Sequence, residues 1–208
     1  MDINFYTKPW HHCTIDNFFP EEIYKRISSH YKDITKLSDT YFYPDKQTKY
    51  YFSTHKPLRV DDIDLDADLE EVKKSFENML GDFPELIQEF MDDNFTLFQG
   101  IHAKLGYREM FDRMFLHGIQ MQPPEYLYHI HDEAKEKYMS LVTYIAPQKN
   151  FGTMLYESED TPYEEPYKHV EWKPNRAFIF SGSKQTTYHA FKTNKFNHRQ
   201  TYVAFFGK

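Results

Sequence analysis

The chain has 208 residues, of which 40% are hydrophobic and 18% aromatic, and its formal net charge is −7. This composition excludes a disordered chain, and the acidic balance gives no general reason to bind nucleic acid through its phosphates. The N-terminal residues lack the pattern of a signal peptide, no apolar run approaches a membrane span, and the single cysteine, Cys13, excludes an intrachain disulfide. We therefore expect one cytoplasmic domain over residues 1–208, with no nucleic-acid and no membrane partner.

The first part of the chain, residues 1–114, is predicted to be mainly helical. Pro20 and the two glutamates after it are typical of a helix start, because proline suits the first turn and acidic side chains complement the positive end of the helix dipole. We expect this helix to end near His30. Apolar residues recur at helical spacing over 69–80 and again after Pro84, so two further helices are expected there, as support for the second half.

Residues 38–60 are rich in Tyr, Phe, Lys and Pro and are predicted to form irregular strand and loop. Their aromatic side chains could line a substrate entrance, and packing against the core is an equally good interpretation. This segment is where we expect substrate contacts. The residues concerned are Tyr41, Phe42, Tyr43, Tyr50, Tyr51 and Phe52.

After residue 114 the pattern changes to short alternating or apolar runs separated by turn residues. The predicted strands are 115–121, 126–131, 138–146, 152–157, 169–172, 176–181, 187–192 and 200–206. Eight short strands at this spacing predict a jelly roll, an architecture that includes the cupin-like barrels. Helices first and strands second make an α+β fold, with a double-stranded β-helix core over 115–208.

Two histidines and one carboxylate in this second half can form a metal site. His131 and Glu133 lie two residues apart at a predicted strand end, so both side chains face one way, with Cα atoms roughly 6.5–7 Å apart. His189 is the candidate third ligand, because the long interval after His131 leaves room for about four or five strands, enough to bring two ends of a barrel together. Two imidazoles and one carboxylate on one face of an octahedral ion characterise non-haem Fe(II) oxygenases.

His169 and Glu171 form the same His-x-acid pair, and chance alone yields such pairs in a chain with 11 His and 32 acidic residues. The interval from His169 to His189 leaves room for only about one strand, so this pair is set aside. We expect Glu171 to be an ordinary exposed strand residue.

A longer pattern of polar, aromatic and turn residues surrounds the three ligands. It consists of Tyr128, His131, Asp132, Glu133, Lys137, Ser140, Tyr144, Pro147, Asn150, Gly152, Thr153, Leu155 and Tyr156, then Pro174, Asn175, Arg176, Tyr188, His189, Arg199, Gln200 and Thr201. This pattern resembles the 2-oxoglutarate- and Fe(II)-dependent oxygenases of the prolyl-4-hydroxylase-like kind, in particular small stand-alone members from bacteria and phages. The resemblance covers residues 115–206 and is loose in the N-terminal half.

The resemblance implies that His131, Glu133 and His189 hold Fe(II), and that 2-oxoglutarate and O₂ are used to hydroxylate a substrate with release of succinate and CO₂. It also implies that Arg199 forms a bidentate salt bridge to the far carboxylate of 2-oxoglutarate, with a hydroxyl donated by Thr201. No catalytic residue beyond the metal ligands is implied. The usual motif is His-x-Asp, and Glu133 replaces the aspartate here while keeping its charge and donor type.

Three further residues are near-site candidates. His129 shares the face of His131 if the strand is regular. Tyr128 and Tyr144 could each hydrogen-bond 2-oxoglutarate or pack in the core.

Other polar residues are expected to be structural. Asp132 should point to the face opposite the ligands. Asn175 and Arg176 should combine turn chemistry with a structural ion pair. The remaining histidines lack partners at metal spacing and are expected on the surface or in the core.

Two other functions stay open on the residues alone. A cupin-type metal enzyme would use His129, His131, Glu136 and His189, although its flanking glycines are absent and Arg199 would have no task. A non-catalytic β-sandwich binding module would make the histidines incidental. The residues do not identify the substrate: the resemblance implies peptidyl proline as one choice and small molecules as others. They do not identify the oligomeric state either.

Overall fold

The computed structural model of the chain describes residues 2–41, 47–52, 60–61, 69–107, 109–182 and 186–208. For residues 41, 48, 50–52, 60–61 and 69 it describes the backbone alone. The aromatic side chains at 41–43 and 50–52, predicted to contact substrate, therefore lie outside the described residues.

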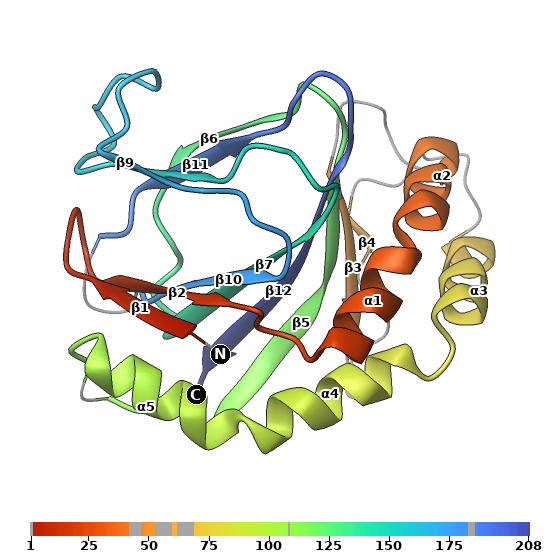
Figure 1. Ribbon diagram of the computed structural model, residues 1–208, viewed down its shortest axis with the longest axis horizontal. Coiled ribbons are helices and arrows are strands. Elements are labelled where there is room, and N and C mark those ends of the chain that lie inside the picture. The colour runs from red at the N-terminus through yellow and green to blue at the C-terminus, as the bar shows by residue number, and fades with distance from the viewer. Residues whose placement is uncertain (1, 42–46, 53–59, 62–68, 108, 183–185) are drawn as a thin grey trace.

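Two antiparallel sheets form the framework of the fold (Figure 1). The larger sheet has the strand order β1 (Asp2–Tyr6), β2 (His12–Asp16), β10 (Arg176–Phe180), β7 (Met139–Ala146), β12 (Arg199–Gly207), β5 (Arg113–Gln122), β3 (Thr48–Phe52) and β4 (Val60–Asp61). The smaller sheet has the order β6 (Leu127–His131), β11 (His189–Lys192), β8 (Thr153–Leu155) and β9 (Lys168–Val170). The predicted α+β fold with a double-stranded β-helix is confirmed.

Helices cover the face of the larger sheet that points away from the smaller one (Figure 1). They are α1 (Glu21–Ser29), α2 (Tyr31–Tyr41), α3 (Leu69–Leu80), α4 (Phe83–Asp93) and α5 (Phe95–Lys104). Helices α1, α3 and α4 match the predicted ones, whereas α2 and α5 were not predicted. In α2, Ile34 is the one buried hydrophobic residue among those described, and Tyr31 and Leu37 pack partly buried against the same core. None of the helices described is long and apolar enough to cross a membrane.

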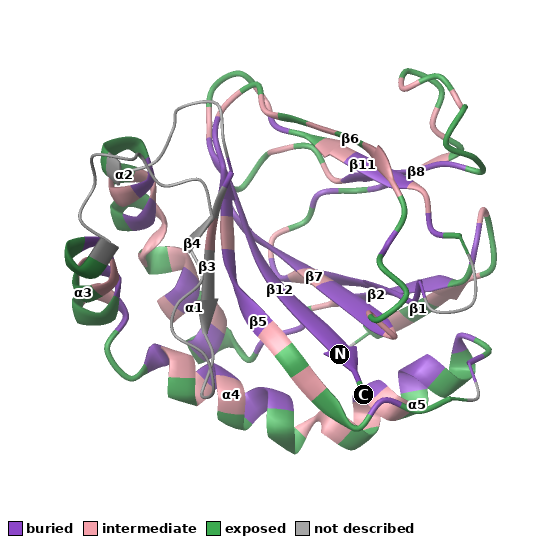
Figure 2. Ribbon diagram, turned by 180° about the vertical axis from the view of Figure 1, so that it is seen from behind, coloured by how far each residue is buried: buried purple, intermediate pink, exposed green. Residues whose placement is uncertain are grey.

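Alternation along β12 separates the two faces of the larger sheet. Tyr202, Ala204 and Phe206 belong to the main hydrophobic core, which the sheet shares with the helices. Arg199 and Val203 instead line the space between the two sheets. Every residue of β12 is buried, and Figure 2 shows the strand in the middle of the molecule. Polar residues on its inward face are therefore held in a rigid, water-poor setting.

Strands also occur in the half of the chain that was predicted to be mainly helical. β2 lies between the edge strand β1 and β10 in the larger sheet, and Cys13 and Ile15 on it are fully buried. Four consecutive residues of β2, His12 to Ile15, are buried, although the sequence alternates polar and apolar residues from His12 to Asp16. That alternation is typical of a strand, but it covers five residues only, and no strand was predicted there.

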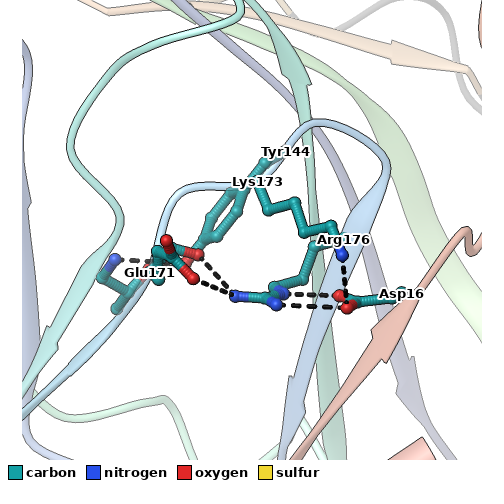
Figure 3. A network of polar contacts seen from close by, with 6 residues as sticks. Asp16, Tyr144, Glu171, Lys173 and Arg176 are labelled. Carbon is teal, nitrogen blue, oxygen red and sulfur yellow. Dashed lines mark hydrogen bonds and ion pairs between the residues drawn. The ribbon is translucent and has the colours of Figure 1, made fainter. Parts of the chain in front are cut away.

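A polar clamp connects this N-terminal segment to the turn before β10 (Figure 3). Arg176 donates through Nε and Nη2 to the two carboxylate oxygens of Asp16, at 2.6 and 3.2 Å. The side chain of Asn175 accepts from the backbone N–H of Phe19 and donates to its carbonyl, both at 2.9 Å. The structural roles predicted for Asn175 and Arg176 are confirmed.

Candidate metal centre

Three potential metal ligands meet where β6 and β11 pair. His131 ends β6 and lies directly opposite His189, the first residue of β11, with ring centroids 4.1 Å apart. Glu133 follows two residues after the end of β6. Ligand atoms of His131, Glu133 and His189 all lie within 4.8 Å of one another, the one such group among the described residues. The fold thus brings His189 next to His131 and Glu133, from which it is remote in the sequence.

Both imidazoles are held in the tautomer that a metal requires. Nδ1 of His131 donates to the backbone carbonyl of His129 at 3.0 Å, and Nδ1 of His189 donates to the carbonyl of Thr187 at 2.6 Å. A carbonyl oxygen only accepts, so each Nδ1 carries the proton and each Nε2 presents a lone pair. Burial lowers the pKa of His189 to about 4 and also lowers the pKa of His131, which favours the neutral rings that bind metals.

Asp132 connects the two ligand-bearing segments from outside the cluster. Its Oδ1 accepts from the backbone N–H and the hydroxyl of Thr187, at 2.6 and 2.9 Å. The carbonyl of Thr187 in turn accepts from His189. Asp132 therefore fixes the residue that orients a ligand, in line with the structural role predicted for it.

A β-bulge in β6 decides which side chains face the site. The register with β11 shifts so that Phe191 lies opposite Tyr128. The ring of Tyr128 stacks on Phe191 at 5.1 Å and meets the ring of His131 edge-on at 4.5 Å. His129 is exposed and lies outside the ligand group. The expectation that His129 shares the face of His131 fails because the strand is not regular there.

Arg199 is buried in the same space without a carboxylate partner among the described residues. It is 1% exposed, its Nη1 donates to the amide oxygen of Gln122 at 3.2 Å, and its Nε has no hydrogen-bond partner there. The guanidinium lies over the rings of Phe191, Trp172 and Tyr144, at 4.4, 5.3 and 5.5 Å from their centroids. Burial lowers the pKa of Arg199 to about 10, so the group is still a cation at neutral pH. A buried cation without a carboxylate partner is energetically unfavourable.

Thr201 and Tyr144, two other candidates, pair across β12 and β7. Thr201 is fully buried, and its hydroxyl has no hydrogen-bond partner in the described part of the chain. The Tyr144 hydroxyl donates to Oγ1 of Thr153 at 2.8 Å, and its ring stacks on Trp172 at 4.7 Å. Tyr144 therefore acts as a wall beside Arg199, whereas Thr201 keeps a donor available.

One cavity of about 270 Å³ joins the ligand group to Arg199. It is lined by residues of both sheets: His131, Glu133 and His189, then Arg199 and Thr153, with Tyr128, Phe178, Phe180 and Phe191 among the aromatic residues and Gln47, Lys49, Gln120 and Lys137 among the polar ones. The metal ligands and the guanidinium of Arg199 therefore line the same cavity.

The alternative ligand sets are not assembled. His169 and Glu171 are exposed, as expected for Glu171, which pairs with Arg176 at 3.3 Å; Glu171 follows the end of β9, however, and is not itself in a strand. The cupin-type set fails in a similar way, because His129 and Glu136 are exposed and lie outside the ligand group.

Several residues that line the cavity or contact Arg199 were not predicted from the sequence. Phe191 lies two residues after His189 on the same strand, and that alternation could have revealed it. Gln122 and Trp172 reach Arg199 from other strands and loops. Their contribution depends on strand register, which a single sequence does not provide.

No family model and no curated protein sequence matches the chain. Solved structures, in contrast, do match the chain. A prolyl-4-hydroxylase from Pseudomonas putida is 11% identical with a TM-score of 0.51, and the match covers 95% of this chain and 92% of that one. A prolyl hydroxylase from Trichoplax adhaerens, in complex with a hypoxia-inducible-factor peptide fragment, is 13% identical with a TM-score of 0.56, over 94% of this chain and 83% of that one.

The chain has the fold of these prolyl hydroxylases. At such low identity the likeness concerns the fold alone, and the chemistry has to be argued from the residues of this chain.

Proposed function

We propose that the protein is an Fe(II)- and 2-oxoglutarate-dependent oxygenase that hydroxylates an organic substrate and releases succinate and CO₂. The observation that carries the proposal is a single cavity with two opposed features. One end presents two neutral imidazoles and a carboxylate, and the other presents a buried guanidinium without an acidic partner among the described residues. An unpaired buried cation is costly in a protein that never binds an anion, so the pair of features favours a bound organic acid.

His131, Glu133 and His189 would hold the metal through two Nε2 atoms and one carboxylate oxygen. The donor set suits Fe(II), because imidazole and carboxylate on one face leave adjacent positions for a chelating cosubstrate and O₂. Iron, when bound there, supplies the activation of O₂ that is coupled to decarboxylation of 2-oxoglutarate. The chain supplies binding, orientation and the exclusion of water.

Arg199 would bind the far carboxylate of 2-oxoglutarate. Gln122 orients the guanidinium by accepting from Nη1, which leaves its Nε edge for the ligand. The hydroxyl of Thr201 lies on the same strand face and would add a second donor. The aromatic walls formed by Phe191 and Trp172 keep water out, which strengthens the attraction between the opposite charges.

The proposal names the substrate only by class. The Trichoplax adhaerens protein is in complex with a peptide fragment, and the Pseudomonas putida protein is named a prolyl-4-hydroxylase. Peptidyl proline is therefore the first substrate to test, with small molecules as the alternative class.

The test is calorimetric titration of 2-oxoglutarate into the Mn(II)-loaded protein, since Mn(II) avoids turnover. Replacing Arg199 with Ala should weaken 2-oxoglutarate binding about 100-fold, about 3 kcal/mol, and Arg199→Lys about tenfold, because lysine keeps the charge without the planar fork. The affinity for Mn(II) should change less than about twofold, because Arg199 does not touch the ligands.

The matched control is Arg113→Ala, which removes an exposed arginine of β5 whose Nη2 donates to the backbone carbonyl of Lys208 at 2.8 Å. It should leave 2-oxoglutarate binding unchanged. Equal 2-oxoglutarate affinity in the wild type and in Arg199→Ala would contradict the anchor role.

A further inference from the structure

Glu133 is the ligand with the greatest freedom. The two histidines are strand residues that face each other in register, whereas Glu133 lies beyond the end of β6. Its side chain also has one more rotatable bond than the aspartate of the resembling family, so more conformational freedom must be lost when it binds a metal. Contacts that fix this carboxylate beforehand would therefore matter more here than at an aspartate.

The near end of the Glu133 side chain is fixed by close packing against the backbone. A Cβ atom added at Gly182 would come within 2.7 Å of Cβ of Glu133, so only glycine allows this approach. The neighbouring Ser181 is held by Tyr107, whose hydroxyl donates to its carbonyl at 3.2 Å, and by a bond from its own hydroxyl to the carbonyl of Tyr138. The remaining freedom lies at the carboxylate.

The far end is held by Lys137. Its Nζ lies 2.7 Å from Oε2 of Glu133, and the side chains of the two residues are 28% and 7% exposed, respectively. A turn in which the N–H of Lys137 donates to the carbonyl of Ala134 at 2.9 Å sets the spacing of the pair. The same Nζ lies 4.0 Å from the ring centroid of Phe205, so the ammonium is held from two sides within the cavity.

We propose that Lys137 is a positioning residue, which holds one oxygen of the Glu133 carboxylate so that the other oxygen is presented to His131 and His189. The proposal rests on the metal site of the proposed function. It explains how a glutamate serves in this position: the extra methylene carries the carboxylate to Lys137, and an aspartate would draw the carboxylate back from it. Such outer partners of metal ligands typically change metal affinity by about 10–100-fold when removed.

The test is a double-mutant cycle read out as Mn(II) affinity, by calorimetry and by the paramagnetic resonance of free Mn(II), without 2-oxoglutarate. Lys137→Met should weaken Mn(II) binding about tenfold in the Glu133 protein. In the Glu133→Asp background the same change should alter the affinity less than about twofold, because the shorter side chain no longer reaches Lys137.

Two controls separate positioning from a general structural effect. Lys137→Arg keeps a cation in place and should restore the affinity to within about threefold of wild type. Lys135→Met removes an exposed lysine of the same turn and should change nothing. Metal-free melting temperatures of all variants should agree with wild type to within a few degrees.

Equal losses in both backgrounds, or no loss in the Glu133 protein, would overturn the role of Lys137. Failure of the proposed function would give a different result in the same Mn(II) titrations. If wild type does not bind Mn(II) in a way that His131→Ala and His189→Ala abolish, the metal site itself is refuted and the Lys137 role falls with it.

Discussion

Arg199 is a buried cation whose desolvation is only partly compensated within the described part of the chain. One side-chain amide and three aromatic rings face it, and its Nε has no hydrogen-bond partner there. Functional sites commonly retain such unfavourable features because the ligand relieves them. The ligand-free protein should therefore gain stability when a suitable dicarboxylate binds.

Thr201 offers a prediction in which stability and binding change in opposite directions. Its buried hydroxyl has no partner, so Thr201→Val should stabilise the ligand-free protein by about 1 kcal/mol. The same change should weaken 2-oxoglutarate binding about fivefold, because one donor to the carboxylate is lost. Urea unfolding and calorimetry measure the two effects.

Thr143→Val is the matched control. Thr143 on β7 is also buried with an unpartnered hydroxyl, but it pairs with Tyr202 and Ala177, whose side chains belong to the core shared with the helices. It should stabilise the protein similarly and leave 2-oxoglutarate binding unchanged. A loss of binding in both variants, or in neither, contradicts the role of Thr201.

At the residue scale, the sequence predicted which three residues lie together but little of what surrounds them. The spacing of His131 and Glu133, the long interval to His189 and the family resemblance grouped the three residues, and their ligand atoms lie within 4.8 Å of one another. Lys137 belongs to the pattern that resembles the family, but its contact with Glu133 depends on a turn and a buried side chain that no spacing rule specifies.

At the scale of elements, the bulge in β6 is the feature that regular patterns could not predict. One unpaired position turns Tyr128 inward and His129 outward, while the carbonyl of His129 still orients the ring of His131. Strands with alternating or apolar runs were predicted near their observed positions. β2 and α2 were not predicted, although His12 to Asp16 alternate and Tyr31, Ile34 and Leu37 recur at helical spacing, because both patterns are short.

The clamp between β2 and β10 gives a prediction for an element. The hydrogen bond from Arg176 is the main reason why the pKa of Asp16 falls to about 2, and both side chains are about 15% exposed. Asp16→Asn should therefore lower the free energy of unfolding by about 1–3 kcal/mol at pH 7, because Arg176 loses its charged partner. Urea unfolding measures this loss.

Glu171→Gln serves as the control, since Glu171 is 80% exposed and contacts the same arginine. Its effect should stay within about 0.5 kcal/mol. Equal effects of the two variants would show that the clamp does not join the N-terminal strands to the sheet.

At the scale of the whole molecule, helices close one face of the larger sheet and the smaller sheet covers the other, so the cavity lies between the sheets (Figure 1). Several histidines are enclosed in this packing. Burial lowers the pKa of His12 and of His117 from 6.5 to about 4. Between pH 6.5 and pH 4 both side chains are therefore neutral in the native protein, whereas they are already protonated in the unfolded chain.

Stability should therefore fall in mild acid. Between pH 6.5 and pH 4 the unfolded chain binds protons that the native state does not, so the free energy of unfolding declines as the pH drops, and it is not reduced by these groups above pH 7. Each histidine contributes at most about 3 kcal/mol to the decline. Urea unfolding from pH 7 to pH 4 should show a shallower decline for His117→Gln than for wild type. The exposed His169→Gln should reproduce the wild-type slope, and an identical slope for all three proteins contradicts this origin.

The central claim is that His131, Glu133 and His189 hold one iron beside an anchored 2-oxoglutarate. Anaerobic titration with Fe(II) and then 2-oxoglutarate, followed by visible absorption, tests it most directly. The weak charge-transfer band of the chelate should appear at one iron per chain in wild type and in His129→Ala, and it should be absent in His189→Ala. A wild-type protein without the band, or a His189→Ala variant that keeps it, would contradict the claim.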